Sequence, residues 1–150
     1  MFFNVPLEEV GCAISEYKPS NNRSQLSQTA KNRLLLDCYN ANPSSTEAAI
    51  INFVDLQETN KLVILGDMLE LGDESDNEHL KILNLLATLP GVKVILVGPF
   101  YKKLSKSLGF PAFSTVQDLK DWIGQNPVAG HFILIKGSRG IQLEQVVESL

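Results

Sequence analysis

Runs of consecutive apolar residues recur along the chain and predict buried strands. The four clearest runs are Leu34–Leu36, Leu62–Leu65, Val92–Val97 and Phe132–Ile135. They are continuous rather than alternating, which is typical of parallel strands that helices cover on both faces. A weaker candidate strand, Ala112–Phe113, precedes a helical pattern that contains Trp122.

Helical patterns of apolar residues follow the strands. The predicted buried faces are Ala49, Phe53 and Leu56; Leu80, Leu83 and Ala87; and Leu143, Val146, Val147 and Leu150. Helix starts are indicated by possible capping boxes at Ser44 with Glu47, Ser75 with Glu78, and Ser114 with Gln117. Alternation of strands and helices predicts an α/β fold, with a Rossmann-like, doubly wound, mostly parallel sheet and helices on both faces.

The beginning of the chain has a different pattern. Leu7–Tyr17 is predicted to be a helix, and a polar stretch follows it. The segment "SQLSQTAKNRLLLD" predicts two antiparallel strands joined by a turn at Ala30–Asn32, near the N-terminal edge of the sheet. We therefore expect a boundary near Ser20, with residues 1–20 as a separate helix and linker and residues 21–150 as the sheet domain.

Composition narrows the class of protein. The 150 residues carry a formal net charge of −4, which argues against a nucleic-acid or acidic-lipid binder, because neutralising phosphates requires a basic face. The two cysteines, Cys12 and Cys38, lack metal-ligand spacing and are expected to be free thiols. No apolar stretch is long enough for a membrane span, and no signal pattern is present, so we expect a cytoplasmic protein without a membrane partner.

Polar residues cluster directly after three of the predicted strands. Ligands of open parallel sheets bind at the carboxyl ends of the strands, so a shared edge predicts a site there. In the first cluster, "DCYNANP", Asp37 can accept two hydroxyl hydrogen bonds, as a ribose would offer, and Asn40 and Asn42 can donate and accept. The alternative is that these residues only build the turn and cap the helix.

The second cluster is acidic and is followed by His79. A magnesium or phosphoacceptor site is one interpretation. The other is that the carboxylates interact favourably with the positive end of a helix dipole, with His79 as a packing or cap residue. The acidic residues concerned are Asp67, Glu70, Asp73, Glu74 and Asp76.

The third cluster, "KGSRG", follows the last strand. Lys136, Ser138 and Arg139, together with backbone amides at a helix start, would suit a carboxylate or a phosphate. Two solvated cations on a loop are the alternative. Neither a GxxxxGK[ST] phosphate loop nor a GxGxxG motif occurs in the sequence, so this chain lacks both of these phosphate-binding motifs.

Three segments, "DCYNANPSS", "VILGDMLELGDES" with His79, and "LIKGSRGIQLEQVV", resemble in that order the C-terminal domain of the Mur ligases. The resemblance covers Asn22 to Leu150. The Tyr-Asn-Ala-Asn and Lys-Gly-Ser-Arg segments are similar to the branch of the family that adds D-alanyl-D-alanine to the UDP-N-acetylmuramoyl tripeptide. Residues Leu7–Tyr17 resemble the last helix of the family's central domain.

The resemblance implies one domain of an ATP-dependent amide ligase of bacterial peptidoglycan precursor synthesis, inactive on its own. In that family the central domain supplies the phosphate loop and the Mg²⁺ ligands, and the N-terminal domain binds the uridine nucleotide. No metal site and no cofactor are therefore expected in this chain by itself. Its partners would be the other two domains and the two substrates.

The resemblance also implies roles for the candidate residues. Asp37 would bind the ribose of ATP, and Asn40 and Asn42 would lie beside the nucleotide or order the turn. Lys136, Ser138 and Arg139 would face the acyl phosphate or the dipeptide carboxylate. One other hypothesis stays open: a freestanding nucleotide or small-molecule binding module of the same fold. A receiver-like phosphoacceptor domain that uses Asp37 or Asp67 is disfavoured, because a receiver needs an acidic pocket that includes residues near the first strand, and the sequence offers none there.

Overall fold

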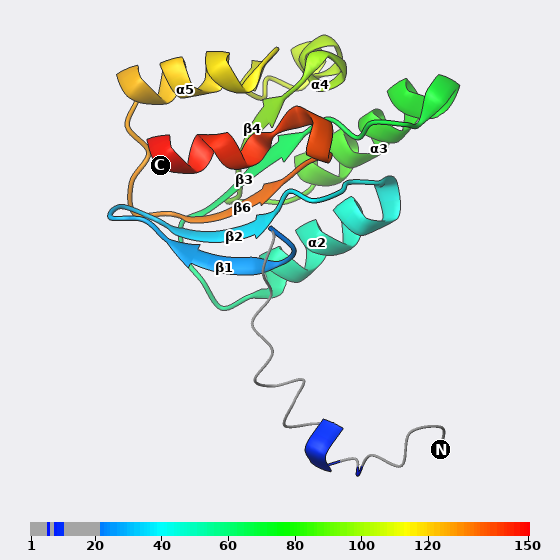
Figure 1. Ribbon diagram of the computed structural model, residues 1–150. Helices are drawn as coiled ribbons and strands as arrows, with labels where there is room; N and C mark the ends of the chain where they lie inside the picture. Colours follow the sequence, from blue (N-terminus) through cyan, green and yellow to red (C-terminus); the bar gives the residue numbers. More distant parts are fainter. Residues whose placement is uncertain (1–5, 7, 11–21) are drawn as a thin grey trace.

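A single six-stranded sheet organises the chain in the computed structural model, which describes Pro6, residues 8–10 and residues 22–150. The strand order is β1-β2-β6-β3-β4-β5 (Figure 1). The strands are β1 (Gln25–Gln28), β2 (Arg33–Asp37), β3 (Lys61–Gly66), β4 (Lys93–Val97), β5 (Ala112–Phe113) and β6 (Phe132–Lys136). All the predicted strands are confirmed, and wherever bounds were predicted the ends differ by at most one residue.

The pairing of the strands is mostly parallel, as predicted. β1 and β2 form an antiparallel hairpin, and the Thr29 amide donates to the Asn32 carbonyl oxygen (2.9 Å) to close its turn. Every other neighbouring pair is parallel. The strand ends that precede the three polar clusters (β2, β3 and β6) therefore meet at one edge of the sheet.

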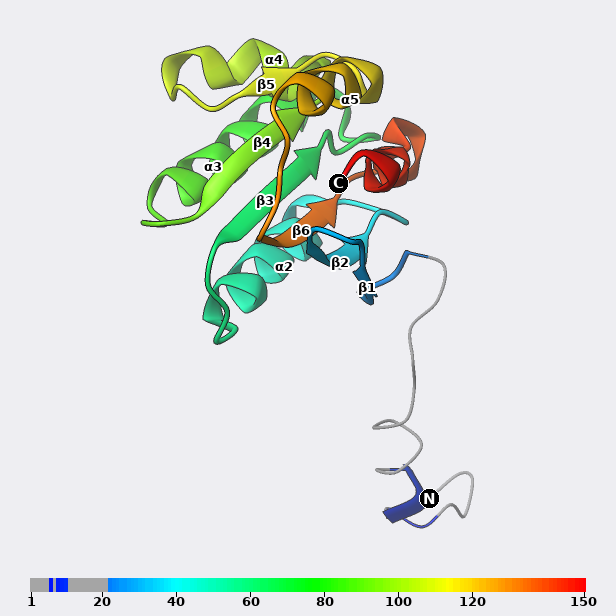
Figure 2. The ribbon, with the colours of Figure 1, turned by 90° about the vertical axis from the view of Figure 1, so that its left-hand side faces the viewer.

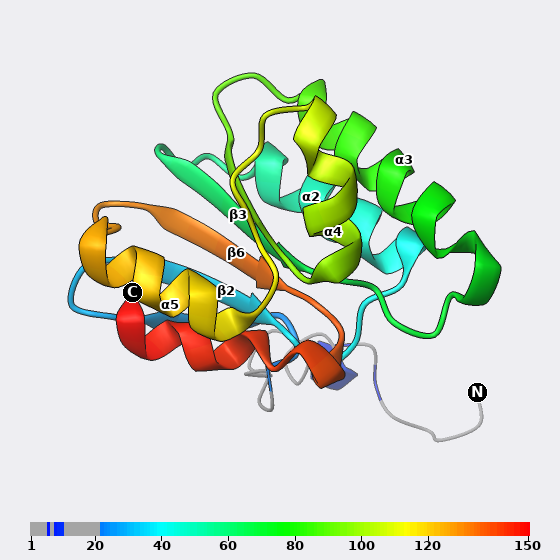
Figure 3. The same cartoon turned by 90° about the horizontal axis from the view of Figure 1, so that it is seen from above.

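Helices cover both faces of the sheet (Figures 1 and 3). α2 (Pro43–Asp55), α3 (Ser75–Ala87) and α4 (Pro99–Leu104) pack over one core, and α5 (Val116–Gln125) packs with the C-terminal segment over the other. Short 3₁₀ helices complete the chain: η1 (Gly72–Glu74), η2 (Ser105–Ser107), η3 (Arg139–Ile141) and η4 (Leu143–Ser149). The side view in Figure 2 shows the sheet between these two layers.

The predicted capping boxes are wrong in position. α2 starts at Pro43, and its cap is Asn42, two residues before the predicted Ser44. The Asn42 Oδ1 accepts from the Ser45 amide (2.9 Å). α5 is capped one residue later than predicted, by Thr115 with Asp118. α3 follows η1 directly and has no side-chain cap. Proline at the first position of α2 fixes that start, because its ring presets a helical φ.

The buried faces of two helices are rotated relative to the prediction. α2 buries Thr46, Ile50 and Phe53, whereas Leu56 lies beyond the helix and is exposed. α3 turns a polar residue inward, because His79 is fully buried with Ile82, Leu83 and Leu86 beside it, while Leu80 is 40% exposed. The period of the pattern was right. The phase was wrong because Thr46 and His79, two polar residues outside the predicted faces, occupy core positions.

The C-terminal segment is not an α-helix as predicted. Two 3₁₀ helices are separated by Gln142 in a left-handed conformation (φ 59°). Leu143 and Val146 are nevertheless buried, because spacing by three residues also fits a 3₁₀ helix. Arg139 consequently begins a single 3₁₀ turn, and the argument from backbone amides at an α-helix start does not apply to it.

Several expectations concern residues whose structure is not described. Residues 8–10 are helical, and the Val10 amide donates to the Pro6 carbonyl oxygen (3.1 Å). The rest of the predicted helix Leu7–Tyr17, the boundary near Ser20 and Cys12 lie outside the described residues. Within the described residues, no helix combines the length and the apolar character that crossing a lipid bilayer requires.

Candidate functional site

The first and third polar clusters meet through an ion pair. Parallel pairing of β2 with β6 places Asp37 opposite Lys136 at the ends of the two strands. The Lys136 ammonium lies 2.6 Å from Asp37 Oδ2, and it also donates to the Asn40 carbonyl oxygen (3.1 Å). Lys136 is only 2% exposed. Because burying an ammonium is costly without partners, these acceptors are what make its position tolerable.

Asp37 keeps part of its hydrogen-bonding capacity for a ligand. Its Oδ2 accepts from Lys136, and its Oδ1 accepts from the Ser24 amide (3.3 Å). The side chain is 22% exposed. A carboxylate has about four acceptor positions, and only two are occupied here. Asp37 can therefore still accept from the two hydroxyls of a ribose while Lys136 holds it in place.

Ser138 ties the loops after three strands together. Its hydroxyl accepts from the Leu69 amide (2.9 Å) and donates to the Ala41 carbonyl oxygen (3.4 Å). Its own amide donates to the Asp67 carbonyl oxygen (3.2 Å). Ser138 is buried, and all three bonds are internal. The structure therefore brings Ser138 to the predicted edge. There its hydrogen bonds connect the third polar cluster to the first and the second.

The two asparagines make local contacts. Asn40 is exposed, and its Oδ1 accepts from the Ala41 amide (2.9 Å). Asn42 is the cap of α2, as described above. Both contacts match the interpretation in which these residues shape the turn, and direct contacts of either residue with a nucleotide stay predictions.

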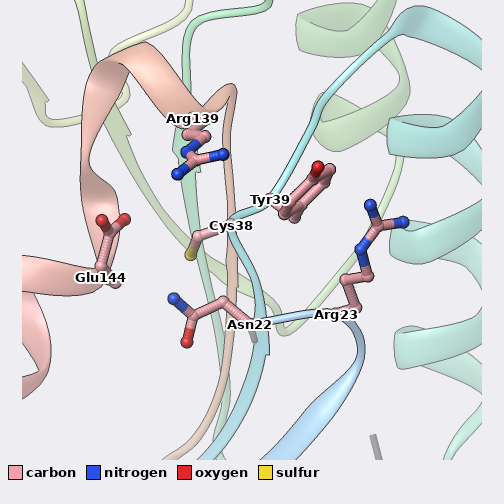
Figure 4. A pocket seen from close by; sticks show the side chains of 6 residues that line it. All are labelled: Asn22, Arg23, Cys38, Tyr39, Arg139 and Glu144. Carbon is pink, nitrogen blue, oxygen red and sulfur yellow. The ribbon is translucent and has the colours of Figure 1, made fainter. Parts of the chain in front are cut away.

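Arg139 lies at the rim of a pocket beside this edge (Figure 4). The pocket has a volume of about 450 Å³ and is lined by Asn22, Arg23, Cys38, Tyr39, Arg139 and Glu144. Two guanidinium groups flank one aromatic ring: Arg23 Cζ lies 3.5 Å and Arg139 Cζ 5.7 Å from the Tyr39 ring centroid. Such cation–π contacts orient the arginines without neutralising them, so the rim is positively charged.

A carboxylate and a thiol line the same pocket. Glu144 Oε2 is enclosed and has no hydrogen-bond partner among the described residues. Burial, and secondarily the charge of Glu144, raises the pKa of the Cys38 thiol to about 12. The Cys38 thiol, which lines the pocket, is therefore protonated and unreactive at neutral pH. The pocket thus combines two cations with one carboxylate.

Asp67, the first residue of the second polar cluster, has a structural role. Both oxygens of Asp67 accept from backbone amides, those of Phe100 and Tyr101 (2.9 Å each), in the first turn of α4. Burial raises the pKa of the Asp67 carboxyl, although the two amides oppose that effect. No group of His, Cys, Asp and Glu side chains that could hold a metal ion exists within the described residues. Asp67 therefore anchors α4, and the magnesium interpretation has no ligand set here.

His79 fixes the loop after β3, which contacts Ser138. Its Nε2 accepts from the Met68 amide (3.0 Å), so the proton must sit on Nδ1, which lies 2.6 Å from the Ser75 carbonyl oxygen. The ring is neutral with both nitrogens used. This geometry confirms the expectation of a packing residue. The next amide along the chain, that of Leu69, is the one that Ser138 accepts.

Three charged or aromatic residues of the pocket were missed by the sequence argument. Arg23 stands in a polar stretch without any motif, Tyr39 was treated as part of the turn, and Glu144 belongs to the C-terminal helical pattern. Only Arg23 carried a usable signal, as a basic residue just before the first strand. Their convergence depends on the hairpin of β1 and β2 lying next to β6.

Comparisons with known proteins agree with this architecture. The family model described as "Mur ligase, glutamate ligase domain" matches residues 22–139. UDP-N-acetylmuramoyl-tripeptide–D-alanyl-D-alanine ligase from Treponema pallidum is 30% identical over 95% of this chain and 32% of its own length. The Rickettsia prowazekii ligase of the same name is 32% identical over 84% of this chain and 29% of its own length.

A solved structure shows the same fold. The crystal structure of MurF from Acinetobacter baumannii superposes with a TM-score of 0.80 at 30% identity, covering 97% of this chain and 33% of that one. The chain thus spans about a third of the length of the curated relatives it matches.

Proposed function

Because the chain belongs to the Mur ligase family, we propose that it is the C-terminal domain of an ATP-dependent amide ligase. The complete protein would add D-alanyl-D-alanine to the UDP-N-acetylmuramoyl tripeptide in the bacterial cytoplasm, as a step of peptidoglycan precursor synthesis. The observation that carries this proposal is the similarity, over 95% and 84% of this chain, to two proteins named UDP-N-acetylmuramoyl-tripeptide–D-alanyl-D-alanine ligase. The charged edge built from Asp37, Lys136 and Arg139 supports it.

The proposed reaction has two steps. The terminal carboxylate of the tripeptide attacks the γ-phosphorus of ATP, giving an acyl phosphate and ADP. The amine of the dipeptide then attacks the acyl carbon, phosphate leaves, and the amine loses a proton. Both steps develop negative charge in a closed cleft, where fixed cations and hydrogen-bond donors stabilise the transition state. Mg²⁺ would assist phosphoryl transfer, and in the family that this chain resembles its ligands come mainly from the central domain.

Asp37 is the proposed ribose contact. It lies at the end of β2, the edge of the sheet where ligands of parallel sheets bind, and only two of its acceptor positions are occupied. Lys136 already has two internal acceptors, so we propose that it mainly holds Asp37 in position and contributes its positive charge from below the surface. Ser138 keeps the neighbouring loops together in the same way. Asn40 and Asn42 would shape the turn beside the nucleotide.

The pocket of Arg139 suits the dipeptide. D-alanyl-D-alanine carries a carboxylate at one end and an amine at the other. Arg139 can bind the carboxylate through two parallel hydrogen bonds, with Arg23 adding positive charge. Glu144 also lines this pocket, and its negative charge favours the positively charged amine end of the dipeptide. Opposite charges at two sides of one pocket favour a zwitterion over a simple anion.

A freestanding binding module of the same fold is the alternative, and one experiment separates the two. The open reading frame that contains this chain is expressed whole, and phosphate release is measured with ATP, the UDP-linked tripeptide and D-alanyl-D-alanine. We expect turnover from the complete protein and none from the 150-residue chain, because this chain lacks the phosphate-loop motif. L-Alanyl-L-alanine serves as the control substrate. Turnover by the chain alone would refute the proposal. Phosphate release by the complete protein that does not depend on D-alanyl-D-alanine would refute it as well.

A further inference from the structure

A second, larger pocket opens at the opposite end of the sheet from Asp37 and Lys136. It has a volume of about 620 Å³ and lies between the amino-terminal parts of β3 and β4, the end of α5 and the residue before β6. Its size is within the range of small-molecule sites, about 300–1,000 Å³. Nothing in the proposed ligase reaction uses this end of the domain.

The walls of this pocket are mostly apolar and partly aromatic. Trp122 and Phe110 contribute aromatic surface, and Val94 and Val128 contribute aliphatic surface. Trp122 is half-buried and is held against Phe113, with ring centroids 5.6 Å apart. A tryptophan that is already ordered by a neighbouring ring offers a flat stacking surface at little further loss of conformational entropy.

A positive charge lies in the wall of the same pocket. The Lys93 ammonium lies 3.1 Å from His131 Nε2. Lysine can only donate, so Nε2 is the acceptor and the imidazole proton sits on Nδ1. In the part of the chain that the structure describes, no carboxylate forms an ion pair with Lys93, and His131 Nδ1 has no hydrogen-bond partner. This part of the wall therefore has more donors than acceptors.

We propose that this pocket is a second binding site, for a small molecule with a flat apolar ring and a carboxylate. The ring would stack between Trp122 and Phe110, and the carboxylate would accept from Lys93. A neutral apolar molecule would leave the lysine without a counter-charge. A highly polar molecule would lose hydrogen bonds to water against the aromatic walls without gaining apolar contacts. The inference rests on the pocket alone and does not depend on the ligase assignment.

Trp122 makes the test direct, because it is the only tryptophan in the chain. A ¹⁵N-labelled sample gives a single indole N–H cross-peak, which reports on the pocket itself. The probe is naphthalene-2-carboxylate, and 2-naphthalenemethanol is the uncharged control of the same shape. We expect the carboxylate to shift the indole cross-peak and the amides of Val92–Ile95 in a saturable way, and the alcohol to bind several-fold more weakly.

Two lysine variants test the charge. Lys93→Met keeps the length of the side chain and should weaken naphthalene-2-carboxylate about threefold to tenfold, within the range for one exposed charge-assisted hydrogen bond. It should leave the alcohol unaffected. Lys81→Met on α3, on the other face of the sheet, is the matched control and should change neither affinity. Equal effects of the two substitutions, or no saturable indole shift at millimolar probe, would overturn the proposal.

Discussion

The Lys136 ammonium lies 2.6 Å from the Asp37 carboxylate, at the ends of two neighbouring parallel strands. Two residues that the sequence assigned to separate ligands thus form one internal pair. Lys136 is 2% exposed and the Asp37 side chain 22% exposed, so the pair is only partly screened by water. A residue proposed to bind nucleotide therefore also contributes to the stability of the domain, and the two roles require separate measurements.

Removal of Asp37 should destabilise the domain. Asp37→Ala leaves a buried ammonium with only the Asn40 carbonyl as acceptor, and we expect a loss of about 2–4 kcal/mol in the free energy of unfolding, allowing for partial solvent exposure. Asp37→Ala with Lys136→Met should recover more than half of that loss. Urea denaturation of the chain measures the free energy of unfolding of the two single variants and of the double variant. If the double variant is as unstable as the sum of the single variants, the pair is not coupled.

Nucleotide binding is tested with a milder substitution in the complete protein. Asp37→Asn keeps an acceptor for Lys136 but loses the carboxylate, so ATP should bind roughly 10-fold or more weakly, as for a lost hydrogen bond to a charged group. Lys136→Met should weaken ATP as well, since Asp37 would lose its orientation. Calorimetry well below the unfolding temperature gives the affinities. An unchanged affinity in Asp37→Asn would assign Asp37 to structure alone.

Arg139 should matter for turnover rather than for stability. Its guanidinium is exposed, and its described contact is with the Tyr39 ring. Lysine cannot reproduce a two-pronged grip on a carboxylate, so Arg139→Lys in the complete protein should lower kcat/KM for D-alanyl-D-alanine at least roughly tenfold, or about 1.4 kcal/mol. Arg33→Lys, at the other end of the sheet, is the control and should retain wild-type kinetics. Wild-type kinetics in Arg139→Lys would remove the anion-binding role.

Gly98 should not tolerate a side chain. Its φ is +123°, and a Cβ there would come within 2.2 Å of Asp67 Cγ, in the carboxylate that anchors α4. We expect Gly98→Ala to cost more than about 3 kcal/mol, because both backbone strain and a clash with a buried group contribute. Gly91 also has a positive φ (+78°), but a Cβ there would meet nothing within 4 Å. Gly91→Ala should therefore cost about 1 kcal/mol. Equal losses in thermal or urea unfolding would contradict the clash.

The Cys38 thiol should be inert in the folded protein. Burial raises its pKa to about 12, so the thiol stays protonated at pH 8, where a free cysteine is partly thiolate. In a Cys12→Ser background, Ellman's reagent should react with the native chain very slowly and with the urea-unfolded chain rapidly. Since the folded state keeps this proton, the thiol's contribution should lower stability as the pH rises above the unfolded thiol pKa, about 8.5. Rapid labelling of the native chain at pH 8 would show that Cys38 is accessible.

The sequence by itself determined the strands and their common edge. Continuous apolar runs such as Leu62–Leu65 and Phe132–Ile135 permit little except a strand buried on both faces, so their positions could be predicted from local pattern. The polar residues that end those runs were placed at one edge for the same reason. The hairpin before Leu34 was also predicted, because strand pattern and turn residues stand next to each other in the chain.

Only the tertiary structure decided which residues meet. Asp37 and Lys136 are 99 positions apart, and they pair because β6 lies between β2 and β3 in the sheet. Strand order depends on how the two cores are filled from both faces, which no local pattern encodes. The inward turn of His79 and the convergence of Arg23 with Arg139 on Tyr39 have the same origin. Each is a long-range contact whose free energy exists only once the sheet has assembled.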